Sequence, residues 1–280
     1  MIHSLLRTMP KGWRTTLKRR VYGGRGNFPY YGHTVFFPKD SLVFRMACMN
    51  DTYEKPMLSL LHDLAEPGTT IFDVGTNIGL MSVALLQVCP ECRVVSFEPS
   101  PNSLKYLQKT YAASSQKARW TLVPKACGTE PGRATFHLAA EADAAYEGLR
   151  DTGRGSGAGT VEVEISTLDA EWRALGCPQV SVIKIDVEGA ETMVLGGAAE
   201  LIRACQPAIL LEWNPANLVA YDVEADSLLV RAEAMGYQVF DGSNRAPVVS
   251  PRHLHLHLRR QEMFILLPGA GTSGAPATQA

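Results

Sequence analysis

The chain has 280 residues, 46% of them hydrophobic, and a formal net charge of -1. This length and apolar content allow a full hydrophobic core. The near-neutral charge argues against a general nucleic-acid-binding protein, which would carry a strongly basic face. No apolar run approaches the roughly 20 residues needed to cross a bilayer, and the first residues lack the apolar stretch of a secretion signal. We therefore expect a cytoplasmic protein without a transmembrane segment.

The six cysteines lack the spacing of a disulfide framework, which is typical of a reducing compartment. Only Cys89 and Cys92 form a CxxC pair, a motif of redox centres and zinc sites. No second pair exists, and this pair falls where a helix is expected to run into the next strand. We interpret it as coincidence.

Residues 1–50 are basic and rich in glycine and aromatic residues, without a long periodic pattern. Between Arg7 and Arg45 there are nine Lys or Arg residues and one acid, Asp40. We expect a cap over the core domain with a solvated charged face; a membrane-surface or anionic-partner patch is the alternative. Residues 269–280 are small or polar, which predicts a disordered tail.

After the cap, apolar segments of strand and helix type alternate along the chain. Such an order predicts a parallel sheet with helices on both faces. A buried strand first enters a glycine-rich turn that opens a helix. Strands are expected at 71–74, 93–98 and 120–127, and helices at 53–64 and 100–111.

The middle of the chain interrupts this alternation. Residues 134–138 and 161–165 alternate like paired strands, and five glycines lie between them in 147–159. This glycine-rich segment is either disordered or a loop that becomes ordered over a substrate. The alternation then resumes, with strands expected at 180–186, 207–212, 237–240 and 263–267 and helices at 189–204 and 225–235.

His253, His255 and His257 alternate with leucines, which predicts an extended segment with three imidazoles on one face. Side chains at alternate positions of a strand spread over too much length to bind one tetrahedral zinc ion without distortion. We interpret the segment as an edge strand with a polar outer face, and its role stays open.

The first strand and its glycine turn are typical of a nucleotide site. Gly75 and Gly79 allow the backbone to approach a ligand closely. Glu98 ends the next strand, where an acid accepts hydrogen bonds from ribose hydroxyls. Asp73, directly before the turn, would repel a pyrophosphate and attract a cation. S-adenosylmethionine carries an ammonium and a sulfonium but no phosphate, so these residues favour it over a dinucleotide.

Three further acids, Asp186, Glu188 and Glu191, lie at the carboxyl end of a buried strand and in the first turn of the next helix. Ligands of open α/β sheets bind outside these strand ends. The helix dipole accounts for one such acid. Three of them beside Asp73 and Glu98 predict a cleft that holds something cationic.

Four motifs resemble the FkbM-type S-adenosylmethionine-dependent methyltransferases: DVGTNIG at 73–79, FEPSP at 97–101, TLD at 167–169 and IKIDVEGAE at 183–191. The resemblance implies an α/β, Rossmann-like class I methyltransferase fold over 51–268, with a seven-stranded, mostly parallel sheet, an antiparallel last strand and helices on both faces. It also implies methylation of a hydroxyl on a sugar, glycan, polyketide or similar small molecule. Thr76 and Cys127 depart from the family's usual alanine and leucine without removing a charged residue or a glycine.

Asp186 is our first candidate for the general base that takes the hydroxyl proton, and Glu188 is the second. Either is able to hold Mg²⁺, which would lower the pKa of the hydroxyl. Glu212, at the end of the following strand, is a third catalytic candidate on the acceptor side. The expected cofactor-binding residues are Glu54, Asp73, Gly75, Thr76, Asn77, Gly79, Glu98, Pro99, Ser100, Ala126 and Asp186.

Two other functions stay open at this point. One is a nicotinamide-dependent (NAD) oxidoreductase, which would bind its dinucleotide despite Asp73. The other is a non-catalytic Rossmann-like scaffold, since fold alone does not fix activity. We expect a small-molecule hydroxyl acceptor and no nucleic-acid partner. The identity of the acceptor, the metal requirement and the oligomeric state stay open.

Overall fold

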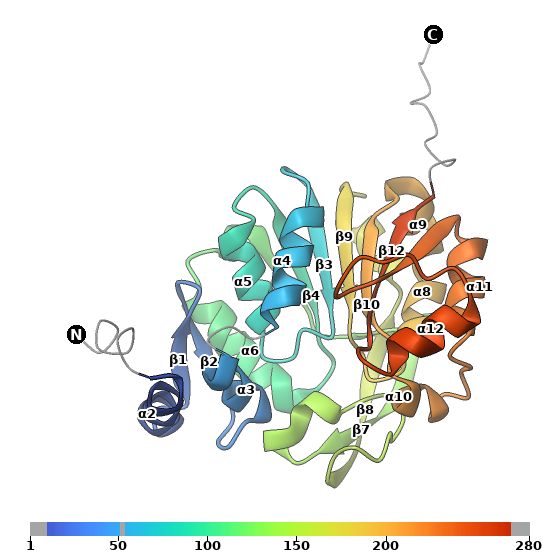
Figure 1. The fold of residues 1–280 in the computed structure, drawn as a ribbon. Coiled ribbons are helices and arrows are strands. Elements are labelled where there is room, and N and C mark those ends of the chain that lie inside the picture. The colour runs from blue at the N-terminus through green and yellow to red at the C-terminus, as the bar shows by residue number, and fades with distance from the viewer. Residues whose placement is uncertain (1–9, 51–53, 270–280) are drawn as a thin grey trace.

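A computed structural model describes residues 10–50 and 54–269. Its centre is a seven-stranded sheet of order β11-β12-β10-β9-β3-β4-β5 (Figure 1), in which β12 runs antiparallel to both of its neighbours. This confirms the predicted Rossmann-like α/β fold with an antiparallel last strand. The strands are β3 (Thr70–Val74), β4 (Arg93–Phe97), β5 (Trp120–Val123), β9 (Val180–Ile185), β10 (Ala208–Glu212), β11 (Tyr237–Asp241) and β12 (Met263–Pro268).

Helices cover both faces of this sheet. One face packs against α4, α5 and α6, and the other packs against α7 to α12. The helices of the first face are α4 (Lys55–Leu64), α5 (Leu80–Val88) and α6 (Pro101–Ala113). Those of the second are α7 (Leu168–Ala174), α8 (Glu191–Gly196), α9 (Ala199–Cys205), α10 (Pro215–Val219), α11 (Ser227–Ala234) and α12 (Pro251–Leu258).

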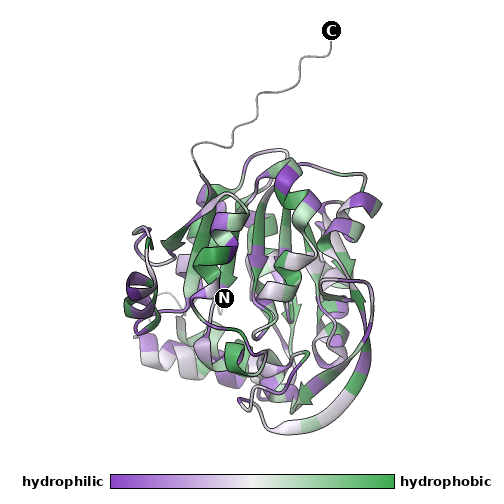
Figure 2. Cartoon of the chain, turned by 90° about the vertical axis from the view of Figure 1, so that its right-hand side faces the viewer, coloured by the Kyte–Doolittle hydropathy of each residue, from purple (hydrophilic) through white to green (hydrophobic). Residues whose placement is uncertain are grey.

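The hydrophobic core is divided by the sheet into two clusters. Successive strand residues point to opposite faces, so Ile71 and Val182 join one cluster while Phe72 and Ile183 join the other. Burial on both sides explains why these strands are continuous apolar runs in the sequence. Figure 2 shows the hydrophobic residues concentrated in the central strands and the polar ones outside.

The N-terminal cap is built from α2 (Lys11–Gly23), the hairpin β1 (Asn27–Tyr30)–β2 (His33–Phe36) and α3 (Leu42–Asn50). The sequence prediction of a segment without long periodicity missed these elements. The rings of Phe37 and Phe44 stack with centroids 3.8 Å apart. Both rings belong to the same core cluster as α4 and α5, so the cap is packed onto the sheet domain.

A smaller three-stranded sheet lies beside the carboxyl edge of the main one, in the order β6-β8-β7. Its strands are β6 (Ala126–Cys127), β7 (Gly132–Ala139) and β8 (Gly157–Ser166). The antiparallel pairing of β7 with β8 confirms the predicted strand pair. The predicted single strand over 120–127 is wrong. It breaks at Pro124, which has no N–H to donate to a ladder.

The predicted helix over 189–204 is also wrong, because the structure divides it into α8 and α9 at Gly196 and Gly197. A Cβ atom on Gly197 would run into the carbonyl oxygen of Gly128. The chain therefore bends where a glycine allows this close approach.

The histidine segment is helix α12 rather than an edge strand. Ser250 caps it by accepting from the N–H of His253, and a proline begins its first turn. In a helix, positions two apart lie on different sides, so the three imidazoles do not share a face. His257 contacts Asp241, whereas His253 and His255 are exposed.

Cys89 and Cys92 are free and buried, away from the cavity described below. Burial raises the pKa of Cys89 to about 11 and also raises that of Cys92. The predicted disordered tail lies, apart from Gly269, outside the described residues. Within the ranges that are described, no helix combines the length and apolar character needed to cross a bilayer.

Candidate active site

A cavity of about 210 Å³ lies at the carboxyl ends of β3, β4, β9 and β10. Open α/β sheets bind ligands at this edge, where the loops after the strands converge. Helix α3 contributes Met46 to the wall, and the 3₁₀ segment η2 (Glu141–Tyr146) contributes Tyr146.

The glycine turn after β3 forms one wall. Gly75 has a φ of +77°, and a Cβ atom there would run into the carbonyl oxygen of Asp186. Gly79 has a φ of +90°, and its Cβ would come within 2.8 Å of Leu107 in α6. Glycine is required at both positions. Gly75 lines the cavity, whereas Gly79 lies behind the wall against α6.

Asp73 does not lie in the cavity wall, although the sequence suggested that it faces a cationic ligand. Its side chain is fully buried behind the turn. One carboxylate oxygen accepts hydrogen bonds from Thr76 Oγ1 at 2.7 Å and Ser82 Oγ at 2.5 Å. The other lies 3.5 Å from the ammonium of Lys184. The charge of Asp73 is thus compensated by a neighbouring strand and not presented to the cavity.

Lys184 lines the cavity, and sequence reasoning missed it as a residue of the candidate site. It is 3% exposed near the carboxyl end of β9, and its ammonium donates to the Gly75 carbonyl at 3.0 Å and lies 3.2 Å from Asp186 Oδ2. Burial by itself lowers its pKa, but the carboxylates of Asp186 and Asp73 raise the pKa above its ordinary value. A lone lysine inside an apolar strand was the available signal, since buried lysines are almost always paired.

Glu98 is buried at the end of β4 and lines the cavity, as predicted. Its two oxygens accept the backbone N–H groups of Asn77 and Ser100, each at 2.8 Å. Burial raises the pKa of Glu98 to about 7, although both N–H groups favour the ionised form. This carboxylate is rigidly held by the backbone.

Glu147 joins Glu98 on this side of the cavity, and sequence reasoning missed it as a site residue. Its oxygens accept from Ser100 Oγ, from Asn102 Nδ2 at 2.6 Å and from the N–H of Ala139 at 3.1 Å. Burial raises its pKa. Ser100 itself does not line the cavity, because its side chain caps α6.

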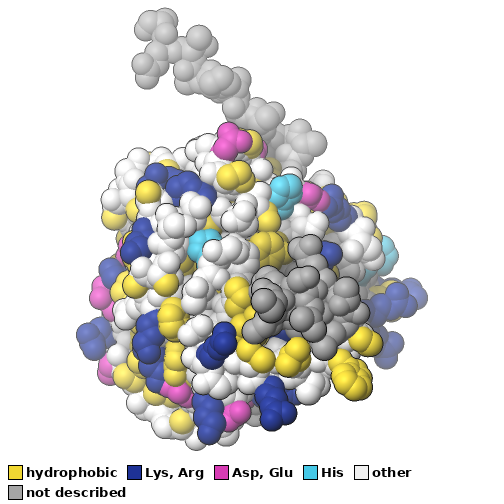
Figure 3. Space-filling model, turned by 90° about the vertical axis from the view of Figure 1, so that its left-hand side faces the viewer, with side chains coloured by type: hydrophobic (Ala, Val, Ile, Leu, Met, Phe, Trp, Pro, Cys, Tyr) yellow, Lys and Arg dark blue, Asp and Glu magenta, His cyan; other side chains and the backbone are white. Residues whose placement is uncertain are grey.

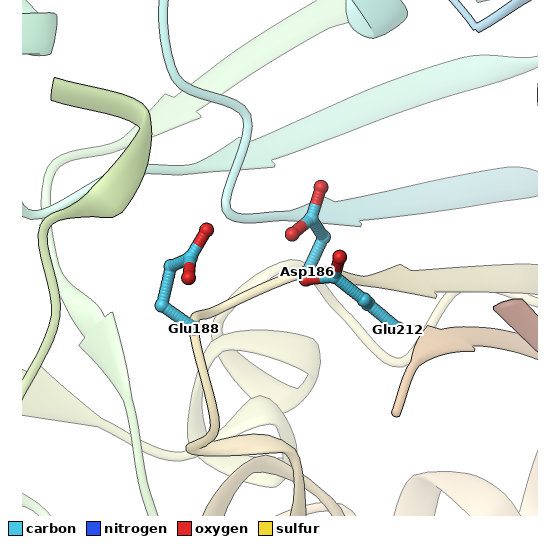
Figure 4. A group of neighbouring side chains, drawn as sticks. All are labelled: Asp186, Glu188 and Glu212. Carbon is cyan, nitrogen blue, oxygen red and sulfur yellow. The ribbon is translucent and has the colours of Figure 1, made fainter. Parts of the chain in front are cut away.

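Asp186, Glu188 and Glu212 form a second group of carboxylates (Figure 4), with one oxygen of each within 4.8 Å of the others. Asp186 follows β9, Glu212 is the last residue of the adjacent strand β10, and Glu188 lies in the loop after β9. The sequence predicted all three as site residues, and the structure brings them together.

Side chains, not backbone groups, satisfy Glu188. Arg154 Nη1 donates to its Oε2 at 2.9 Å and Asn217 Nδ2 at 2.8 Å. Burial, with a contribution from Asp186, raises the pKa of Glu188 to about 8. Burial and the neighbouring Asp186 and Glu188 carboxylates raise the pKa of Glu212 to about 10. Protonation or a cation would relieve this repulsion.

The donor set of this group fits a divalent cation, because carboxylate oxygens are the ligands of Mg²⁺ and Ca²⁺. Two oxygens on opposite sides of Mg²⁺ lie about 4.2 Å apart, and on opposite sides of Ca²⁺ up to about 5.2 Å. The 4.8 Å limit of the group suits Ca²⁺ as it stands and Mg²⁺ after a small contraction. Lys184 and Arg154 already compensate part of the charge.

Glu191, which the sequence grouped with these acids, holds the loop instead of lining the cavity. Its Oε1 accepts from the N–H groups of Val187 at 3.3 Å and Gly189 at 3.2 Å. Burial raises its pKa to about 7. It fixes the turn that carries Glu188.

Arg154 brings the glycine-rich segment onto the cavity wall. Its guanidinium lies 4.7 Å from the centroid of the Tyr146 ring and pairs with Glu188. The N–H of Arg150, in the same segment, donates to the hydroxyl of Tyr221 at 3.1 Å. Of the two sequence interpretations, the structure agrees with the ordered loop. Sequence reasoning missed Arg154, because nothing local ties it to Glu188.

Most of the other predicted cofactor residues lie in the cavity wall. They come from the glycine turn, from the segments after β4 and β5, and from the residue that precedes α4. They are Glu54, Thr76, Asn77, Pro99 and Ala126.

Comparison with known proteins identifies relatives among methyltransferases. The chain is 29% identical to the methyltransferase SdnD of Sordaria araneosa over 176 residues, covering 53% of this chain and 68% of that protein. It is 26% identical to the hexuronic acid methyltransferase AglP of Haloferax volcanii over 152 residues, covering 54% of this chain and 59% of AglP.

Among solved structures, the methyltransferase FkbM from Methylobacillus flagellatus KT aligns with a TM-score of 0.44 at 15% identity. The alignment covers 80% of this chain and 52% of that one, so the chain spans about half the length of this relative. The sequence model of the family described as "Methyltransferase FkbM domain" matches residues 73–239, more than half of the chain. The chain therefore belongs to the FkbM methyltransferase domain family.

Proposed function

We propose that this chain transfers a methyl group from S-adenosylmethionine to a hydroxyl of a small molecule such as a sugar, glycan or polyketide. The observation that carries the proposal is the cavity itself, whose wall contains six acids: Glu54, Glu98, Glu147, Asp186, Glu188 and Glu212. Burial raises the pKa of most of them, and a cationic ligand would favour their ionised forms.

The cofactor supplies a methyl group on a positively charged sulfur, from which an oxygen nucleophile is able to displace it. On the side of β3 and β4, Gly75 lines the cavity and Glu98 offers acceptors for ribose hydroxyls. Pro99 and Asn77 line the same region. The rigid hold on Glu98 supports a role in recognition.

The second carboxylate group supports the transfer step. As the acceptor oxygen bonds to the methyl carbon and the bond to sulfur breaks, a carboxylate within hydrogen-bond reach takes the hydroxyl proton. Asp186 is the first candidate, because it is only half-buried, unlike Glu188, and lies beside Lys184, which holds its orientation. Glu188 and Glu212 are the second and third candidates.

The acceptor side is more mixed in character. Leu149 and Tyr146 bring apolar surface to it, and Arg154 brings a cation. Such a wall suits a sugar or another polar molecule with an apolar face. The name of AglP, a hexuronic acid methyltransferase, supports a sugar-like acceptor.

A divalent cation at Asp186, Glu188 and Glu212 is the remaining part of the proposal. The cation would lower the pKa of an acceptor hydroxyl and orient its oxygen. Treatment with a chelator, followed by addition of Mg²⁺ or Ca²⁺, separates a metal-assisted transfer from one that uses carboxylates alone.

Thermal-shift titration tests the proposal. We expect S-adenosylmethionine and S-adenosylhomocysteine to raise the Tm in a concentration-dependent manner, because a ligand that binds only the folded state stabilises it. NAD should leave the Tm unchanged. Stabilisation by NAD alone would favour an oxidoreductase, and a Tm that none of the three compounds changes would favour a non-catalytic scaffold.

A further inference from the structure

Charge is distributed very unevenly along this chain. Residues 1–45 contain nine Lys or Arg and one acid, a formal charge of +8. Because the whole chain has a net charge of -1, residues 46–280 carry a formal charge of -9. Five of the nine cations lie on α2, which contains no acid. The molecule therefore has one strongly basic side and an acidic remainder.

Helix α2 is anchored to the domain through its inner side. Tyr22 is 8% exposed and belongs to the core cluster shared with α3 and α4. Thr15 Oγ1 donates to the carbonyl of Cys48 in α3 at 3.4 Å. The helix thus presents one fixed outer face at the edge of the molecule (Figure 1).

The outer face of α2 combines cations with an exposed indole. Trp13 is 73% exposed, whereas the other three tryptophans are buried. Arg20 follows it by seven residues, two helical turns further on the same side. Arg19 and Lys11 are also exposed. Figure 3 shows Lys and Arg side chains spread over this side of the molecule, beside hydrophobic ones.

We propose that the outer face of α2 docks onto the surface of an anionic lipid bilayer. Cations on a surface helix are attracted to acidic headgroups. Tryptophan prefers the boundary between headgroups and acyl chains, where its ring is half in an apolar medium. The acidic remainder of the chain is repelled by the same bilayer, which gives the docked molecule one orientation.

A nucleic acid is the competing polyanion, and the arrangement favours it less. Arg20 and the indole of Trp13 share the outer side of a single short helix, with the exposed Lys11 and Arg19 around it, and an indole beside cations suits a membrane interface. Docking of this kind is reversible and sensitive to salt, because one indole buries little apolar area and the charges are screened. It is also independent of the methyl acceptor.

Vesicle co-sedimentation with the full chain tests the proposal. We expect binding to vesicles of phosphatidylcholine mixed with phosphatidylglycerol and little binding to phosphatidylcholine alone. R19E/R20E should bind about tenfold or more weakly to the anionic vesicles. The matched control is R259E/R260E, an exposed pair of the same charge after α12, which should bind like the unmodified protein.

Tryptophan fluorescence gives a second readout that reports on the helix itself. Trp120, Trp172 and Trp213 are buried, at 2%, 9% and 0% exposure, so a shift of emission to shorter wavelength on adding anionic vesicles should come from Trp13 and disappear in Trp13→Phe. Equal binding to both kinds of vesicle, or equal loss of binding in R19E/R20E and R259E/R260E, would overturn the proposal. Binding of duplex RNA without binding of vesicles would also overturn it, in favour of a nucleic-acid surface.

Discussion

Glu98 and the carboxylates that follow β9 differ in the partners that hold them. Glu98, after β4, is fixed by two backbone N–H groups. Glu188, after β9, is held by the side chains of Arg154 and Asn217, and Asp186 by that of Lys184. Backbone donors are placed by the fold, whereas long side chains change partners by rotating.

This difference separates two kinds of chemistry within one cavity. A carboxylate locked by the backbone suits recognition of a ligand that stays the same in every turnover. Carboxylates held by side chains, with the pKa of Glu188 and Glu212 raised by burial and by neighbouring carboxylates, suit a step in which a proton or a cation arrives and leaves. Variants of each group should therefore fail in different measurements.

The largest effect is expected for Asp186→Asn. If Asp186 takes the acceptor's proton, its loss should lower kcat by ~10²-fold to 10⁴-fold. Lys184 remains paired with Asp73 in this variant, so the fold and the cofactor affinity should be retained. Single-turnover rates together with calorimetric titration check this expectation.

Glu130→Gln is the control for Asp186→Asn, because Glu130 is exposed and does not line the cavity. Its turnover should equal that of the unmodified protein. An Asp186→Asn protein with normal turnover would move the base to Glu188 or Glu212.

A smaller effect, on cofactor affinity rather than on turnover, is expected when Glu98→Gln is compared with Glu188→Gln. Removing the charge at Glu98 should weaken S-adenosylmethionine binding by about 10-fold to 100-fold, corresponding to ~1.5–3 kcal/mol for hydrogen bonds to a charged group. Glu188→Gln should change cofactor affinity much less. Calorimetric titration of both variants measures the contrast, and equal losses in the two would remove the distinction between the groups.

The fold was predictable where its signals are local. Buried strands such as β3 and β9 are continuous apolar runs, and the glycine turn marks the first strand end. The failures came where one residue decides between two structures. Pro124 ends β5, and Ser250 with the following proline starts a helix in a segment whose alternation resembles a strand.

The candidate site was predictable to the extent that strand ends converge. Asp186 and Glu212 lie at the carboxyl ends of adjacent parallel strands, so their proximity follows from the topology. The contacts of Glu147 and Arg154 depend on how the β7–β8 hairpin and its glycine-rich connection fold over the edge, and no local pattern encodes that. The inward position of Asp73 depends on Lys184, a pairing across strands far apart in the sequence.

The smallest expected effect is the pH dependence of stability and of cofactor affinity. The folded protein without ligand holds protons on Glu98, Glu188 and Glu212 above the ordinary pKa of glutamate. Between that ordinary value and the raised values, the folded state binds more protons than the unfolded state. The free energy of unfolding of the ligand-free protein should therefore fall as pH rises through this window.

Cofactor affinity should change in the opposite direction. A ribose-binding Glu98 accepts hydrogen bonds best when ionised, so binding releases a proton below a pKa of about 7. Affinity should then rise with pH by at most about tenfold per unit and level off above that pKa. Titrations in buffers of different ionisation enthalpy measure the proton release directly. The part of the release that follows a pKa of about 7 should be lost in Glu98→Gln and kept in Glu188→Gln; if both variants kept it, the group with that pKa would lie elsewhere in the cavity.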